Sequence, residues 1–159
     1  MIYSRRPVWV PGLAILFLLG PASGAQGEEG FGRRASVRVP RLEVAPTLED
    51  FVGMRPPPHL EGRMARVDRF TQWIPRDGEP ASQRTEAYLG YDQAHLYVVF
   101  VCFDSEPDRI RARMTRREDI YRDDRVDVFL DTINDQIRSY LFTVNPYGVQ
   151  ADANWIERG

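Results

Sequence analysis

The stretch between residues 84 and 104 constrains the fold more than any other part of the chain. Side chains alternate between two faces over residues 85–91, which is the period of a β-strand. Residues 92–94 supply a short polar turn, and residues 96–103 follow as an unbroken apolar run rich in β-branched and aromatic side chains. The pattern predicts a β-hairpin. Because its second strand is apolar on both faces, we expect that strand to be central and covered on each side.

Further strands are predicted before and after this hairpin. Alternating apolar and polar side chains mark each of them, and polar or Pro-Gly turns separate those that follow the hairpin. The predicted segments are 126–131, 140–145 and 149–155, with short strand-like pieces at 37–39 and 64–70.

The overall pattern predicts an all-β protein. Short strands joined by turns, without a sustained helical period, favour an antiparallel β-sandwich with two sheets of the immunoglobulin or jelly-roll kind. The charged stretch 105–124 leaves two alternatives open, a solvent-edged strand over 110–115 or a short helix over 108–117. The chain supplies about five or six strands where roughly seven to nine complete a sandwich. We therefore expect the sandwich to be incomplete at its C-terminus and the chain to be the beginning of a longer protein.

Prolines dominate the segment between residues 37 and 67. Pro40, Pro46 and the triplet at 56–58 exclude long helices and central strands there. We expect this segment to run extended along the surface.

The first 25 residues have the pattern of an export signal. Arg5 and Arg6 precede a short apolar core at 13–19, and Ser23 and Ala25 are the small residues that precede a cleavage point. The apolar run is shorter than the ~20 residues that span a bilayer, so the chain is not expected to cross a membrane. Either the general secretory or the twin-arginine route fits this signal. We expect an exported chain, in the periplasm, at the outer membrane or secreted.

The predicted export signal divides the chain into three parts and determines the net charge of the chain that remains after cleavage. A signal peptide at 1–25 and a flexible stretch at 26–36, rich in Gly, Glu and Arg, precede the sandwich domain at 37–159. Without the signal, 19 arginines face 23 acidic residues, a net charge of −4. A chain of this charge lacks the positive field that recruits nucleic acid.

Cys102 is the single cysteine, which excludes an internal disulfide.

Several short motifs, in a fairly specific order and spacing between residues 70 and 152, resemble the family 9-like carbohydrate-binding domain found near the N-terminus of large exported bacterial proteins. The matching residues are Phe70-Thr71-Gln72, Pro75, Gly78, Arg84-Thr85, Tyr91-Asp92, Leu96-Tyr97-Val98, Asp104, Pro107, Arg117-Glu118-Asp119, Asp124, Val126, Asp131, Asn145-Pro146, Gly148-Val149-Gln150 and Asp152.

The resemblance implies an antiparallel β-sandwich that binds a glycan or oligosaccharide and is not catalytic by itself, in a larger protein of carbohydrate catabolism. In many relatives an outer-membrane β-barrel follows this domain. An alternative function is therefore that of an interaction domain that docks on such a barrel and binds no sugar. A third alternative is a haem-binding sandwich, with Met54, Met64 or Met114 as ligand. The acidic motif leading to a Trp that usually opens these domains is replaced by residues 47–51, Thr-Leu-Glu-Asp-Phe.

Candidate ligand-binding residues follow from the chemistry of sugar recognition. Flat aromatic faces stack on pyranose C–H surfaces, and planar polar groups at their border reach the hydroxyls. Trp73 and Trp155 lie outside regular alternating stretches, so either is a stacking platform or a packing residue. Arg84 either reaches a ligand hydroxyl or forms an ion pair that holds strand ends together. Asn145 before Pro146 either binds ligand or caps a turn.

Acidic residues after the hairpin define a candidate calcium site. Asp104, Asp123, Asp124 and Asp127 offer the hard oxygen ligands that Ca²⁺ prefers, although the twelve-residue calcium loop is absent from the sequence. The alternative is a solvated ion-pair surface with the neighbouring arginines. No pattern in the sequence singles out a pair of catalytic carboxylates, and the sequence contains no nucleophile elbow or phosphate loop. We therefore predict no enzymatic activity for this chain.

Overall fold

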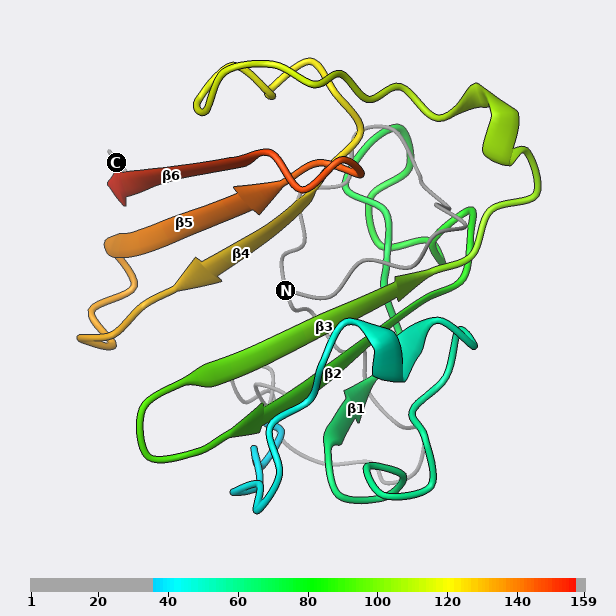
Figure 1. Cartoon of the computed structure of the whole chain (residues 1–159). Coiled ribbons are helices and arrows are strands. Elements are labelled where there is room, and N and C mark those ends of the chain that lie inside the picture. The colour runs from blue at the N-terminus through cyan, green and yellow to red at the C-terminus, as the bar shows by residue number, and fades with distance from the viewer. Residues whose placement is uncertain (1–35, 157–159) are drawn as a thin grey trace, which may run out of the picture.

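The computed structural model describes residues 36–156, and the predicted signal peptide lies outside them. This part of the chain forms two three-stranded antiparallel sheets, with strand orders β1-β2-β3 and β4-β5-β6 (Figure 1). The all-β prediction is confirmed. The strands are β1 (Ala65–Val67), β2 (Thr85–Tyr91), β3 (Leu96–Cys102), β4 (Val126–Leu130), β5 (Arg138–Val144) and β6 (Gln150–Ile156), and the short 3-10 helices are η1 (Glu49–Phe51) and η2 (Pro107–Arg109).

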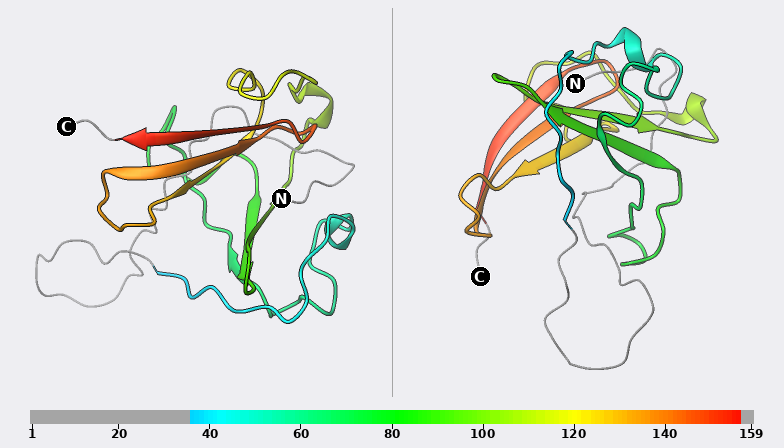
Figure 2. Two further views of the ribbon diagram at one scale, coloured as in Figure 1. Left: turned by 60° about the vertical axis from the view of Figure 1, so that its left-hand side comes forward. Right: turned by 90° about the horizontal axis from the view of Figure 1, so that it is seen from below.

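The two sheets differ in strand direction. In the left view of Figure 2, β2 and β3 run across the direction of β4, β5 and β6. The face-to-face packing that defines a sandwich therefore stays a prediction. Within residues 36–156, no helix is both long and apolar enough to cross a membrane.

The predicted hairpin is confirmed as β2 and β3. Their register pairs Thr85 with Cys102 and Tyr91 with Leu96. The expectation that β3 is a central strand is wrong, because β3 ends the order of its sheet and β2 is central. Both faces of β3 are nevertheless packed, Val99 on one face and Phe100 on the other, which explains its apolar sequence.

Asp92 holds the hairpin turn. Its carboxylate accepts hydrogen bonds from the backbone amides of Ala94 (2.7 Å) and His95 (2.8 Å) and from the hydroxyl of Tyr97 (2.6 Å). The Tyr97 hydrogen bond, followed by the two amides, lowers the pKa of Asp92 to about 2. The turn is therefore built around an ionised carboxylate.

We expect the contribution of Asp92 to stability to depend on pH. A carboxyl group with a lowered folded-state pKa stabilises the fold above its unfolded pKa of about 3.9, and this contribution disappears as the pH falls to about 2. Asp92→Asn should therefore be less stable than the wild type in urea unfolding at pH 7, and the difference should vanish near pH 2. Gln93→Ala, in the same turn, should show a pH-independent difference. An NMR titration midpoint of Asp92 near 4 would contradict this account.

Most residues of the proline-rich segment lie at the surface, as expected, but η1 and several turns interrupt the segment and some of its side chains are buried in the core. Leu42, Phe51, Leu60 and Met64 are buried in one cluster with Tyr88 of β2 and two valines of β3. In Figure 1 this cyan and teal segment lies over β1 and β2. Proline lacks the backbone N–H that a β-ladder needs, but the side chains around it remain free to pack. No strand forms over residues 37–39.

Leu42 joins this segment to the sheet. Its amide donates to the carbonyl of Tyr91 (2.7 Å), and the Tyr91 amide donates to the carbonyl of Pro40 (3.1 Å). The Leu42 side chain covers Gly90, where an added Cβ would stand 2.5 Å from Leu42 Cδ1. Glycine at position 90 is therefore required for this close approach.

The charged stretch before β4 forms neither predicted alternative. Apart from η2, residues 105–124 contain no helix or strand. Carboxylates take the place of a pairing strand, since Asp124 accepts a hydrogen bond from the Arg111 amide (2.7 Å) and Asp123 from the Arg113 amide (3.1 Å). Ile120, fully buried, anchors the stretch.

Candidate functional site

One face of the second sheet carries an aromatic row formed by Tyr140 and Phe142 of β5. Their side chains are 50% and 45% exposed. The two residues are two positions apart on one strand, so both point to the same face, at Cα positions roughly 6.6 Å apart. The structure therefore leaves two neighbouring rings open to solvent.

A polar row borders these rings on β6. The register places Asn154 opposite Tyr140 and Asp152 opposite Phe142, and both β6 positions belong to the same face as the rings. On the other side, β4 places Leu130 opposite Tyr140. Neighbouring strands are about 4.8 Å apart, which brings amide and carboxylate groups within reach of any molecule stacked on the rings. We call this surface, Tyr140 and Phe142 with Asp152 and Asn154, the aromatic face.

Two arginines lie at the border of the aromatic face. Arg138 begins β5 on the same face as Tyr140, and its Nε donates to Asp135 Oδ2 at 2.9 Å. Arg117 donates from Nη2 to Asp152 Oδ1, and this hydrogen bond raises the pKa of Arg117. Each cation is thus paired with a carboxylate while it remains more than half exposed.

The opposite face of the sheet supplies a buried support. The Thr143 hydroxyl donates to Asp127 Oδ1 at 2.8 Å, and Arg125 Nε pairs with the same oxygen at 3.1 Å. Leu141 and Ala151 are also buried on this face. Because alternate residues of β5 are held there, the backbone beneath the aromatic row is fixed.

Asn145 is a buried structural residue at the end of β5. Its Nδ2 donates to the Arg113 carbonyl (2.9 Å) and to Asp123 Oδ2 (3.0 Å). Its Oδ1 accepts the amides of Tyr147 and Val149, both at 3.0 Å. The structure thereby gives Asn145 the turn-capping role that the sequence left open, and it brings together Asn145 and Asp123 from the predicted set.

The four acidic residues of the predicted calcium site are largely occupied by protein donors. Arg113 and Asn145 lower the pKa of Asp123 against the opposing effect of burial, whereas burial raises the pKa of Asp124. Asp127 binds Thr143 and Arg125 as described, and Asp104 accepts the Glu106 amide at 2.7 Å. Across residues 36–156, no group of three or more His, Cys, Asp or Glu has an arrangement that could hold a metal ion.

Arg84 forms the ion pair that the sequence left open as its alternative role. Its Nη2 lies 3.2 Å from Oε1 of Glu86, a buried carboxylate that also binds Arg66 at 2.6 Å. The Arg84 guanidinium stacks over the Phe103 ring at 3.9 Å. Hydrogen bonding to Glu86 adds to burial in raising the pKa of Tyr88 to about 12.

The two predicted tryptophans lie in different parts of the fold. Trp73 is half-exposed in the loop between β1 and β2. Trp155 is also half-exposed, but on the face of the second sheet opposite the aromatic row, where its ring packs edge-on against Phe129 at 5.8 Å. It pairs with Ser139, roughly 20 Å along β5 from Asn145. The predicted ligand-binding residues therefore form no single site.

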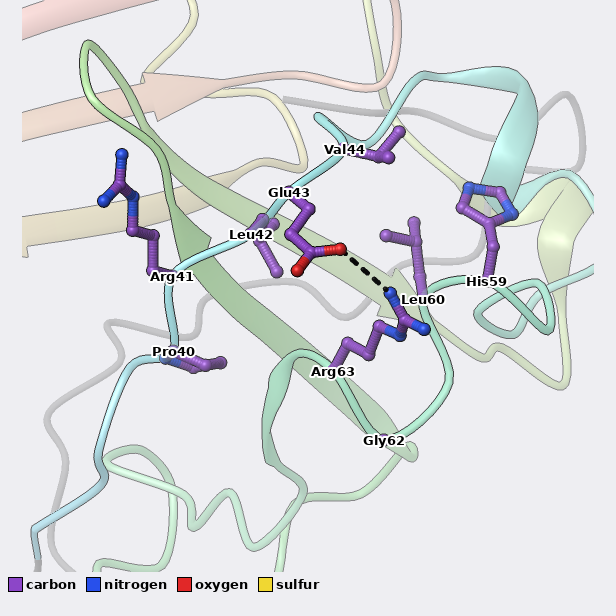
Figure 3. A pocket seen from close by; sticks show the side chains of 9 residues that line it. All are labelled: Pro40, Arg41, Leu42, Glu43, Val44, His59, Leu60, Gly62 and Arg63. Carbon is purple, nitrogen blue, oxygen red and sulfur yellow. Dashed lines mark ion pairs between the residues drawn. The ribbon is translucent and has the colours of Figure 1, made fainter.

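A separate hollow of about 370 Å³ lies beside the proline-rich segment (Figure 3). Leu42 and Leu60 are buried in its wall, and at its rim Arg63 points toward Glu43, 3.7 Å between Nη1 and Oε2. His59, also at the rim, lies 3.5 Å from Asp50. The hollow holds none of the predicted site residues and no Trp, Tyr or Phe ring.

The methionines proposed as haem ligands are placed differently. Met64 is buried in the main core cluster, Met54 packs against that cluster, and Met114 is exposed. Met64 and Met54 thus contribute to packing.

Tyr140 and Phe142 were not among the predicted site residues. Their alternation was visible, but the polar border comes from their register with β6, which the sequence does not specify. The even-numbered polar residues Gln150, Asp152 and Asn154 were the available signal.

Comparison with protein families, curated proteins and solved structures found no match for this chain.

Proposed function

We propose that this chain is an exported, non-catalytic module that binds a glycan on the aromatic face. The observation that carries the proposal is the exposed pair Tyr140 and Phe142 with a row of amide and carboxylate side chains directly beside it. Exposed apolar surface rimmed by polar groups is typical of binding sites. The resemblance to family 9-like carbohydrate-binding domains supports the same function.

The chemistry of a sugar fits both rows of the aromatic face. The C–H face of a pyranose ring stacks on an aromatic ring, and its hydroxyls both donate and accept hydrogen bonds. Asp152 accepts, whereas the Asn154 amide donates and accepts, so together they match equatorial hydroxyls at the edge of a stacked ring. The border arginines add donors.

The face is open along β5, which favours an extended saccharide chain over a single enclosed sugar. The aromatic row follows the strand direction, and neither Tyr140 nor Phe142 is enclosed. Binding along such a row should strengthen as the oligosaccharide lengthens until both rings are covered.

We expect Tyr140→Ala to weaken glycan binding by about 30-fold, because the loss of a central aromatic contact costs about 2 kcal/mol. Isothermal titration with a panel of soluble polysaccharides and oligosaccharides measures the effect. Trp73→Ala, which removes an equally exposed ring from the loop between β1 and β2, should leave the affinity unchanged.

The same titration contains the outcomes that would contradict the proposal. Absence of binding by the wild type across a broad panel would overturn the function. Loss of binding in Trp73→Ala, with Tyr140→Ala unaffected, would place a glycan site on the loop between β1 and β2 instead.

A further inference from the structure

The outer edge of β3 is a long sheet edge that no other strand of residues 36–156 covers. β3 reads Leu-Tyr-Val-Val-Phe-Val-Cys, with no charge, proline or glycine, and within residues 36–156 no strand pairs with its outer side. Natural proteins guard exposed edges with charges, prolines, bulges or covering segments. An uncharged segment of high β-propensity at an open edge is a template for pairing with another strand.

The other outer strands of the two sheets carry such guards. β4 contains Asp127 and β6 contains Asp152, while β1 is three residues long and contains Arg66. The unguarded edge of β3 therefore stands out among the sheet edges that the structure describes.

Backbone hydrogen bonds fix which residues of β3 face outward. The amide of Phe103 donates to the carbonyl of Arg84 (2.8 Å) and the amide of Asp92 donates to the carbonyl of His95 (3.0 Å), so both ends of the hairpin place odd-numbered residues in hydrogen-bonded pairs with β2. By alternation, the even-numbered residues direct their backbone N–H and C=O groups toward the open edge. These residues are Leu96, Val98, Phe100 and Cys102.

We propose that this edge pairs with β3 of a second copy of the chain, antiparallel, with the twofold axis at Val99. In this register Val98 of one copy lies opposite Phe100 of the other. The two residues form a hydrogen-bonded pair, because both direct their backbone groups outward. Tyr97 then faces Val101 of the second copy. Both are aromatic–β-branched pairs, which stabilise neighbouring strands. The two sheets become one six-stranded sheet.

Charge also favours a second copy. Self-pairing brings together two uncharged strands, so no like charges face each other within β3. Continued past the strand ends, the same register places His95 opposite Phe103 of the second copy, so no like charges meet there either. The edge is therefore complementary to itself.

Sedimentation velocity tests the assembly. We expect the chain at tens of micromolar to sediment with twice the monomer mass, and Val98→Lys, which places a charge at the outward-facing centre of the edge, to shift it to the monomer. A wild type that is monomeric at this concentration would overturn the proposal, as would a dimer unaffected by a folded Val98→Lys variant.

Disulfide trapping tests the register without disturbing the fold. The register places Leu96 opposite Cys102 of the second copy, at a Cα distance of about 5.5 Å, within the range that a disulfide bridges. Burial raises the pKa of the Cys102 thiol to about 11, so the reaction is run at alkaline pH, where this thiol can ionise. Leu96→Cys should then give a covalent dimer with oxidised glutathione, which takes up the two electrons released as two thiols become one disulfide. The two Cys102 residues lie roughly 20 Å apart in this register, so the wild type should not crosslink.

The double variant Leu96→Cys/Cys102→Ser is the matched control, and it should give no covalent dimer. Crosslinking in this control would show that position 96 of one copy contacts position 96 of the other, and it would overturn the register. Failure of Leu96→Cys to crosslink would overturn it as well. Neither result depends on glycan binding, so this proposal and the proposed function fail independently.

Discussion

Phe51→Ala is expected to lower the free energy of unfolding by about 3–5 kcal/mol. The Phe51 ring is 2% exposed and lies 5.5 Å from the ring of Tyr88, between the proline-rich segment and the first sheet. Truncation removes this contact and leaves a cavity in the core. Urea denaturation followed by circular dichroism measures the change.

The adjacent Val52 provides the control for this prediction. Its side chain is 55% exposed, so Val52→Ala should change the stability by no more than about 0.5 kcal/mol. If Phe51→Ala and Val52→Ala had equally small effects, the proline-rich segment would not be part of the core.

Asn145→Ala should be the second large destabilisation, about 3 kcal/mol. Asn145 is 1% exposed, and its side chain donates to the Arg113 carbonyl and the Asp123 carboxylate while it accepts two backbone amides. Alanine would leave several of these buried groups without a partner, each at a cost of about 1–3 kcal/mol before relaxation and water entry. Urea denaturation again measures the change.

Asn154→Ala serves as the matched variant, since it removes the same functional group from β6, where the side chain lies on the open aromatic face. Its stability should stay within about 0.5 kcal/mol of the wild type. A loss below about 1 kcal/mol in Asn145→Ala would mean that the end of β5 does not depend on the Asn145 hydrogen bonds.

Local patterns in the sequence predicted the strands that form, although they also predicted a short strand at 37–39 that does not form. The alternation at 85–91 and the apolar run after it are properties of neighbouring residues, and they correspond to β2 and β3. The segments predicted at 126–131, 140–145 and 149–155 likewise overlap β4, β5 and β6. Strand period is a short-range signal, so it survives without knowledge of the partner strand.

Long-range packing was not predictable in the same way. Leu42, Phe51 and Leu60 are irregularly spaced among prolines, and only their contact with the sheet makes them core residues. The stretch 105–124 was likewise mispredicted, because Asp123 and Asp124 satisfy backbone amides that a strand or helix would have satisfied.

The candidate site could be predicted only in part, less well than the strands but better than the long-range packing. Tyr140 and Phe142 were recognisable as one face of a strand, but an exposed face and a core face have the same period. Only the register of β5 with β6, which sets Asp152 and Asn154 beside the rings, distinguishes them. Trp73 and Trp155 were predicted from their aromatic rings and their position outside regular alternating stretches, and the fold places one in the loop between β1 and β2 and the other on β6.

Chemical-shift mapping of the isotopically labelled chain tests glycan binding on the aromatic face most directly. On titration with the tightest-binding saccharide of the panel, we predict that the amide resonances of residues 140–142 and 152–154 shift, while those of the hairpin formed by β2 and β3 stay in place. Shifts confined to the hairpin, to the Trp73 loop or to the hollow beside Arg63 would contradict the account.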